Sequence, residues 1–167
     1  MSSRKGFLDS LFSLFLRSRS RRFSKSASIF LTRSGSINSP NVHSHKNPIP
    51  HAAEINGLIM SSAITGIDND TGKFPDSKEK QIELSFKNML IVLEEAGASC
   101  DNIIKVDLYF KDKSDRKIVN PFWTKMFPDE NNRPARHSHL AILESECIIQ
   151  IVFTALKKQI NSSGINP

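Results

Sequence analysis

A short basic stretch, residues 133–137, carries the side chains best suited to binding an anion, because its sequence is Arg-Pro-Ala-Arg-His. Arginine stays charged at any working pH, and its planar guanidinium matches the two oxygens of a carboxylate. Pro134 restricts the backbone that leads to Arg136. The stretch therefore predicts a fixed cation for a carboxylate, although a surface-loop arginine or a structural ion pair would have the same local sequence.

Length and composition indicate one ordinary globular domain, because 167 residues with 38% hydrophobic and 24% charged content can bury one core. Cys100 and Cys147 stand far apart and in no Cys-x-x-Cys or Cys/His spacing. We therefore expect no disulfide, no metal site and no cofactor, in a reducing compartment. No run of about 18 apolar residues occurs, so we expect no transmembrane helix and no stable membrane insertion.

The net charge of +6 is distributed unevenly along the chain. Residues 1–48 contain nine lysines and arginines against one acid, Asp9, which gives +8 and leaves −2 for the remainder. A mildly acidic remainder lacks the basic face of a nucleic-acid-binding domain. The positive charge therefore belongs to the N-terminal segment, and we expect no nucleic-acid partner.

Residues 1–47 are rich in serine and arginine and contain one acid. Their first apolar side chains recur at helical spacing: Phe7, Leu8, Leu11, Phe12 and Phe15. This pattern is typical of an organelle transit peptide, and its composition fits a disordered extension equally well. A secretory signal is disfavoured because Asp9 and several serines interrupt the apolar run. We expect a domain at 48–157 and a tail at 158–167, in a soluble intracellular protein that is cytoplasmic, or mitochondrial or plastid if residues 1–47 are a transit peptide.

Turn signals and hydrophobic periodicity divide the expected domain into elements in the order β-β-β-α-β-α-β-β. Asn56-Gly57 predicts a hairpin turn, Ser77 an N-cap, and Gly97 the end of the first helix. Asn120-Pro121 suggests the cap and first position of the second helix. The expected strands are 52–55, 58–62, 64–68, 103–110, 138–143 and 147–156, and the second helix runs through 118–126.

Two strands indicate how the layers pack. Residues 103–110 alternate, which places Ile104, Val106, Leu108 and Phe110 on one buried side. The last strand, 147–156, has apolar residues on both faces and so needs two covers. We expect an α+β domain whose sheet has two helices on one face and another subunit on the other.

The order of elements and an ordered series of short motifs resemble the Rid (YjgF-type) family of reactive-intermediate deaminases over residues 48–157. The motifs are Asn56-Gly57-Leu58-Ile59-Met60-Ser61-Ser62-Ala63, Asp68 with Thr71-Gly72, Asn88, Glu95-Ala96-Gly97-Ala98, Ile104-Lys105-Val106, Asn120, Phe127 and Pro134-Ala135-Arg136. The resemblance implies a chorismate-mutase-like fold and a homotrimer.

The same resemblance implies a function: hydrolysis of reactive 2-imino or enamino acids to 2-oxo acids and ammonia in an intersubunit cleft. Arg136 would bind the substrate carboxylate. Ser62 would hydrogen-bond the substrate or a water molecule, with Ala63 and Asn120 also at the substrate. The partners implied are a small carboxylate substrate and two further copies of the chain.

The sequence departs from the family pattern at three places. Active deaminases of the family carry a glutamate on the last strand, where the two candidate positions here are Gln150 and Val152. An N-terminal tyrosine is replaced around His51, and the glycine after the motif serine is Ala63.

The missing glutamate leaves two functions open. Gln150 can orient a water molecule but cannot accept its proton, so His137, His139 or a backbone carbonyl would have to assist. His137 adjoins Arg136 in sequence, although strand alternation places the two on opposite faces. The alternative to a deaminase is a non-catalytic trimer that binds small carboxylates or a partner protein through the same cleft. The acidic domain argues against a third reading, a ribonuclease.

Overall fold

A computed structural model describes residues 35–144 and 146–157 of the chain. The transit-peptide motif and the tail at 158–167 lie outside the described residues. The folded part begins earlier than residue 48, because β1 (Gly35–Ile37) pairs with β2 (Ala52–Ile55) and Val42 is buried in the core. No helix of the described part is long and apolar enough to cross a membrane.

The strands form one mixed sheet in the order β1-β2-β3-β7-β5-β6, with β4 also paired to β7. All pairs are antiparallel except β5 with β6. The remaining strands are β3 (Leu58–Ser61), β4 (Ile64–Thr65), β5 (Ile103–Phe110), β6 (Ala135–Leu140) and β7 (Ile149–Leu156). β7 therefore lies at the centre of the sheet and β6 at an edge.

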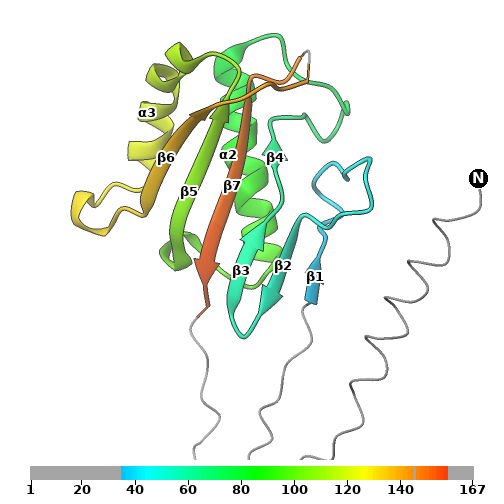
Figure 1. Ribbon diagram of the computed structural model, residues 1–167, viewed down its shortest axis with the longest axis vertical. Helices are drawn as coiled ribbons and strands as arrows, with labels where there is room; N and C mark the ends of the chain where they lie inside the picture. Colours follow the sequence, from blue (N-terminus) through cyan, green and yellow to red (C-terminus); the bar gives the residue numbers. More distant parts are fainter. Residues whose placement is uncertain (1–34, 145, 158–167) are drawn as a thin grey trace, which may run out of the picture. The chain divides into compact units, whose positions relative to one another are not determined.

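Two helices, α2 (Lys78–Glu95) and α3 (Arg116–Met126), cover one face of this sheet; Figure 1 shows α2 behind the central strands and α3 next to β6. Short 3-10 turns join the elements: η1 (Cys100–Asn102), η2 (Lys113–Asp115) and η3 (Glu130–Asn132). The core lies between these layers; its largest fully buried side chains include Phe110, Phe153, Ile59, Ile82, Met89 and Leu93. The predicted α+β fold with two helices on one face is confirmed.

Several local signals act as their sequence predicts. Asn56 and Gly57 both have positive φ, 53° and 83°, as a tight hairpin turn between β2 and β3 requires. The Ser77 hydroxyl accepts a hydrogen bond from the Lys80 N–H at 3.2 Å and so caps α2. Gly97, with a φ of 68°, follows the end of that helix.

The predicted strand 64–68 is wrong in length, since β4 ends at Thr65. At Gly66 the backbone runs against α2, where an added Cβ would lie 1.9 Å from the Gln81 carbonyl oxygen. The carbonyls of Thr65 and Ile67 accept hydrogen bonds from the Asn88 side chain, at 2.9 and 3.0 Å. A side chain of α2 thus replaces the strand partner that would have extended β4.

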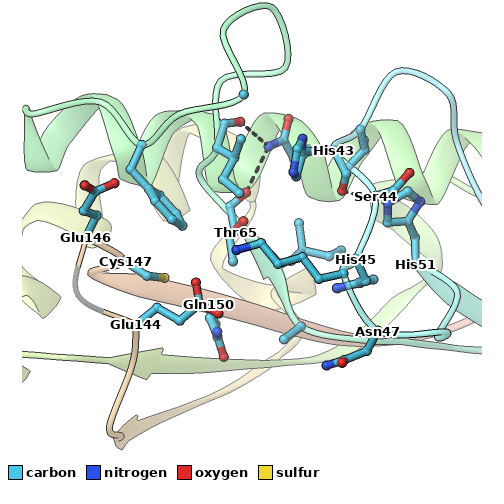
Figure 2. A pocket seen from close by; sticks show the side chains of 18 of the residues that line it. His43, Ser44, His45, Asn47, His51, Thr65, Glu144, Glu146, Cys147 and Gln150 are labelled. Atoms are coloured by element: carbon cyan, nitrogen blue, oxygen red, sulfur yellow. Dashed lines mark hydrogen bonds between the residues drawn. The ribbon is translucent and has the colours of Figure 1, made fainter.

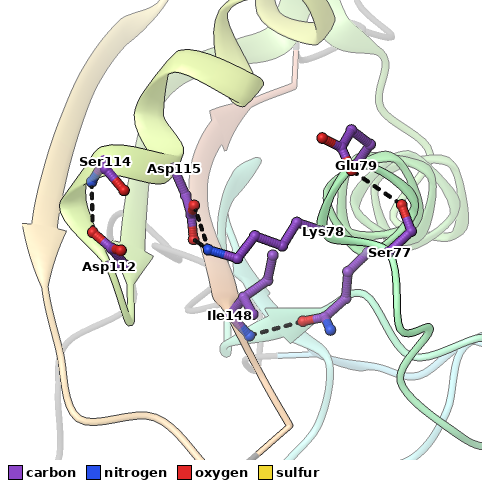
Figure 3. A network of polar contacts seen from close by, with 8 residues as sticks. Ser77, Lys78, Glu79, Asp112, Ser114, Asp115 and Ile148 are labelled. Atoms are coloured by element: carbon purple, nitrogen blue, oxygen red, sulfur yellow. Dashed lines mark hydrogen bonds and ion pairs between the residues drawn. The ribbon is translucent and has the colours of Figure 1, made fainter.

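The prediction of Asn120-Pro121 as a helix start is also wrong, because α3 begins at Arg116 and contains Pro121. The start is fixed by tertiary contacts that Figure 3 shows. Asp115 is 4% exposed and forms an ion pair with Lys78 of α2, at 2.8 Å. An ion pair with another helix therefore holds the beginning of α3, five residues before the proline.

Two strands differ from the expected pattern. A bulge between Ile103 and Lys105 turns Ile104 outward, where it is 50% exposed, and buries Ile103 instead. The strand expected at 138–143 is β6, which begins at Ala135 because it pairs with β5 from Lys105 onward. Its earlier start places Arg136 within the sheet, opposite Val106.

The face of the sheet that no helix covers carries exposed apolar side chains. Leu58 lies opposite both Ile55 and Leu156 in the pairing registers, so these three share one face. Met60 of β3 is 55% exposed on the same face, because it stands two residues from Leu58. We refer to Ile55, Leu58, Met60 and Leu156 as the apolar open face. The second subunit that the sequence predicts over it stays a prediction.

Candidate functional site

Arg136 projects from edge strand β6 toward α3. Its guanidinium carbon lies 4.8 Å from the centre of the Trp123 ring, and its Nη2 donates to Asn120 Oδ1 at 3.0 Å. Asn120 and Trp123 are three residues apart on α3, so they present to the same side of the helix. Burial, and to a lesser degree the charge of Arg116, lower the pKa of Arg136, which still remains a cation at any working pH.

The Arg136 guanidinium has hydrogen-bonding capacity to spare. Its Nη1 is buried and has no hydrogen-bond partner. Within the described part of the chain, none of the ion pairs involves Arg136. Since a buried donor without a partner is costly, this arrangement suits a ligand that supplies an acceptor. The structural ion-pair reading of Arg136 therefore finds no support among these residues.

A pocket of about 560 Å³ lies elsewhere, between the segment before β2, strand β4 and the segment that leads into β7 (Figure 2). Two predicted site residues, Ala63 and Gln150, line it. The lining also includes Asn88 and Cys147, which the sequence analysis named for other reasons, and six side chains that it did not single out: His43, His45, Lys46, Lys73, Glu144 and Glu146. Ordinary turn and loop composition hid these residues, because only the fold brings their segments together.

Ser62 makes its contacts just outside this lining. Its hydroxyl donates to the Pro50 carbonyl oxygen at 2.7 Å, and its backbone N–H donates to the His51 carbonyl at 2.9 Å. These bonds fix the end of β3 against the segment before β2. The Ser62 hydroxyl oxygen still has lone pairs and can accept a hydrogen bond from a ligand.

Two histidines of the pocket have different roles. His51 is 3% exposed; its Nδ1 accepts from the Ser39 N–H at 3.2 Å, so its Nε2 carries the proton and donates to the His43 carbonyl at 3.1 Å. His45 Nε2 is instead buried without a partner. Burial, then the nearby His51 and His43, lower the pKa of His45. A neutral imidazole with an unpaired nitrogen can accept a proton.

Acidic and sulfur groups stand at the other end of the pocket. Glu144 and Glu146 come just before β7, and Figure 2 shows Glu144 beside Gln150. These two side chains supply carboxylates near Gln150, the residue of β7 whose side chain is an amide. Cys147 is 1% exposed and its thiol donates to the Ile149 carbonyl at 3.3 Å. Burial raises its pKa to about 11, so it is a protonated thiol rather than a nucleophile.

His137 lies on the face of the sheet opposite Arg136. It pairs in register with Asp107, and its ring centre is 4.0 Å from that of His139. His139 Nε2 in turn lies 3.1 Å from Asp107 Oδ1. The structure therefore does not bring the imidazole of His137 to the guanidinium of Arg136 within one chain.

The predicted site residues fall into two groups. Asn120 joins Arg136 at edge strand β6, whereas Ala63 and Gln150 meet in the pocket and Ser62 lies at the end of β3. Strands β7 and β5 separate β3 from β6. Three spacings between adjacent strands amount to roughly 14 Å, so a small ligand on Arg136 cannot contact Ser62 of the same chain.

Comparison with known proteins gives one matching family. A family model described as Endoribonuclease L-PSP matches residues 42–156. A RutC family protein of Aquifex aeolicus is 35% identical over 100 residues, which are 60% of this chain and 80% of that protein. The chloroplastic Reactive Intermediate Deaminase A of Arabidopsis thaliana is 34% identical over 109 residues, covering 60% of this chain and 57% of that protein.

Solved structures agree with the family match. The structure of YyfA, a protein of the conserved Rid family from Yersinia pestis, covers 75% of this chain and 100% of that chain, with a TM-score of 0.70 and 26% identity. The YjgF gene product of E. coli has a TM-score of 0.68 at 24% identity, covering 74% of this chain and 99% of that chain, which shows a shared fold.

Proposed function

This chain belongs to the Endoribonuclease L-PSP family, which includes the YjgF and RidA proteins, and from this premise we propose that it hydrolyses small 2-imino or enamino acids to 2-oxo acids and ammonia. The observation that carries the proposal is the Arg136 guanidinium, which is held by Asn120 and Trp123 and has a buried nitrogen without a partner. A substrate carboxylate would supply the acceptors that this guanidinium lacks. The charge of −2 outside residues 1–48 favours such a small anion, bound at one cation, over RNA.

The complete site lies between two chains in this proposal. Arg136 and Asn120 of one chain face a pocket of the next, where Ser62, Ala63 and Gln150 contact the substrate. The separation of roughly 14 Å within one chain supports this arrangement, because a single chain cannot place both groups on one small ligand. The apolar open face supplies the surface for assembly, and a trimer is the assembly proposed.

The reaction needs water activation and a route for two protons. Water adds to the imine carbon, and the resulting carbinolamine loses ammonia as its C–N bond breaks, which leaves the 2-oxo acid. Gln150 orients the water. His45, neutral and unpaired at Nε2, accepts a proton from the water as it adds and passes it to the imine nitrogen; the second proton follows from the carbinolamine hydroxyl to the nitrogen as the C=O bond forms and ammonia leaves. Glu144, which also lines the pocket, is the carboxylate alternative. His137 is less suited to this step because it lies on the opposite face from the Arg136 of its own chain.

A carboxylate-binding module without turnover is the second candidate. The observation that favours it is Gln150, because β7 then offers an amide in place of a proton-accepting group. Binding through Arg136 would be the same in both cases. Turnover therefore has to separate them.

The experiment measures ammonia release from freshly generated 2-iminobutyrate by the full chain and by three variants. The proposal predicts hydrolysis above the buffer rate, lost in Arg136→Ala and reduced in His45→Gln. Arg133→Ala is the matched control, since Arg133 lies in the same stretch but donates to the carbonyls of Phe127 and Pro128. Saturable binding of 2-oxobutyrate without any turnover would establish the binding module instead.

A further inference from the structure

Three side chains that can bind a metal converge on the open face of the sheet, away from Arg136. Asp107 of β5 lies directly opposite His137 of β6, and His139 stands two residues further along β6. Alternate residues of a strand point to one face, so both histidines lie on the same side as Asp107. One nitrogen of each histidine and one carboxylate oxygen all lie within 4.8 Å of one another.

Neighbouring contacts hold two of these three groups in place. His139 Nε2 lies 3.1 Å from Asp107 Oδ1, and the Tyr109 ring stacks on the His139 ring with centres 4.6 Å apart. Lys105 Nζ lies 2.9 Å from the other carboxylate oxygen, Oδ2. Both carboxylate oxygens of Asp107 therefore already face a donor side chain, Lys105 at Oδ2 and His139 at Oδ1.

We propose that Asp107, His137 and His139 bind one divalent transition-metal ion of the zinc class per chain. Two imidazoles and one carboxylate are a donor set for zinc and its neighbours, whereas magnesium and calcium prefer oxygen ligands. Asp107 Oδ1 is the ligand oxygen, because Lys105 holds Oδ2 and can stay there as a hydrogen-bond donor to the bound carboxylate. Water completes the coordination.

The geometry needs only a small closure. Metal–ligand distances of about 2.1 Å in a tetrahedron place ligand atoms about 3.4 Å apart. Asp107 Oδ1 and His139 Nε2 are already 3.1 Å apart, so the adjustment falls on His137. When the ion binds, the proton that His139 Nε2 donates to Asp107 leaves that nitrogen and the neutral ring carries its proton on Nδ1. Within the described residues the His137 side chain is exposed and has no hydrogen bond, so its ring can turn toward the other two ligands at little cost.

This site is independent of the proposed deaminase chemistry. Arg136 points to one face of the sheet and the three ligands point to the other. None of the three ligands is among the residues that line the pocket. The site shares its sheet face with the apolar open face. Binding should therefore be measured on the full chain in its native assembly, so that any contact between subunits is retained.

The test titrates zinc chloride into the metal-free protein by calorimetry and reads the visible spectrum of the cobalt(II) form. We expect one zinc ion per chain in the wild type. The variants His137→Ala, His139→Ala and Asp107→Asn should each weaken binding at least about tenfold and remove the tetrahedral cobalt absorption. His43→Ala is the matched control, because His43 is an exposed histidine of the pocket group, and it should bind as the wild type does.

Two results would overturn the proposal. One is the absence of zinc binding by the folded wild type. The other is zinc binding that His137→Ala and His139→Ala leave unchanged, above all if His43→Ala removes it, since the ion would then sit among the pocket histidines. Circular dichroism of each variant separates loss of a ligand from loss of the fold.

Discussion

Replacing Arg136 with alanine removes the one cation that the proposed substrate site depends on. The change deletes the guanidinium that donates to Asn120 and stacks on Trp123, together with the buried nitrogen that has no partner. It leaves the backbone pairing of β6 with β5 intact, because that register involves main-chain groups. The fold and assembly should therefore persist, and ligand affinity should report the lost contact.

The size of the effect follows from the type of contact. A hydrogen bond to a charged group contributes about 1.5–3 kcal/mol, so Arg136→Ala should weaken binding of 2-oxobutyrate by roughly 10- to 150-fold. Arg136→Lys keeps the charge but loses the planar pair of donors, and its affinity should lie between the two. Arg133→Ala should bind as the wild type does, since Arg133 donates only to backbone carbonyls.

The assay combines calorimetric titration of 2-oxobutyrate with sedimentation of each variant. Sedimentation has to show the wild-type assembly, so that a change in affinity is not a change in oligomeric state. If Arg136→Ala altered neither binding nor imine hydrolysis, Arg136 would be a structural residue of the β6 edge. The proposed site would then be wrong.

Three further predictions concern stability and assembly. Gly66→Ala should lower the unfolding free energy by about 1–3 kcal/mol in denaturant titration, because its Cβ would collide with the Gln81 carbonyl oxygen 1.9 Å away. Gly35→Ala is the control and should cost far less, since nothing lies within 4 Å of an added Cβ there. Equal effects of the two changes would contradict this account. The pKa of His45 is lowered from 6.5 in the folded protein, so the contribution of its neutral form to stability is present above about pH 6.5 and is lost as the pH falls through the lower folded pKa. His45→Gln should therefore flatten this part of the plot of melting temperature against pH. An unchanged slope would refute a buried neutral imidazole at position 45. Met60→Glu should place a charge on the apolar open face and yield a folded protein of lower mass in sedimentation. Lys87→Glu, on the solvent side of α2, is the control and should leave the mass of the assembly unchanged. An intact assembly in Met60→Glu would show that this face is not the interface.

Local chemistry was readable from the sequence wherever neighbouring residues decide the conformation. The Asn56-Gly57 turn, the Ser77 cap and the Gly97 terminus depend on backbone preferences of single residues, and all three are observed. From residue 52 onward, the order of strands and helices along the chain followed from turn signals and hydrophobic periodicity, which reports the buried face of each element, whereas β1 was not predicted. Arg136 was identified as a candidate carboxylate-binding residue from its side chain alone, because arginine is charged and offers planar donors in almost any surroundings.

Tertiary contacts decided the features for which the sequence analysis was wrong or silent. The Lys78–Asp115 ion pair starts α3 before Pro121, and Asn88 ends β4, although in each case the partner lies on another element. The bulge that exposes Ile104 depends on its pairing with β7.

The sites depend on such pairing even more strongly. His137 and His139 are two apart in sequence, but only the parallel register of β5 and β6 adds Asp107 to them. The pocket likewise contains residues near position 45 and residues near position 147, which only the folded chain brings together. Sequence spacing records contacts along one strand or helix, whereas contacts between strands depend on register, which the whole packed core determines.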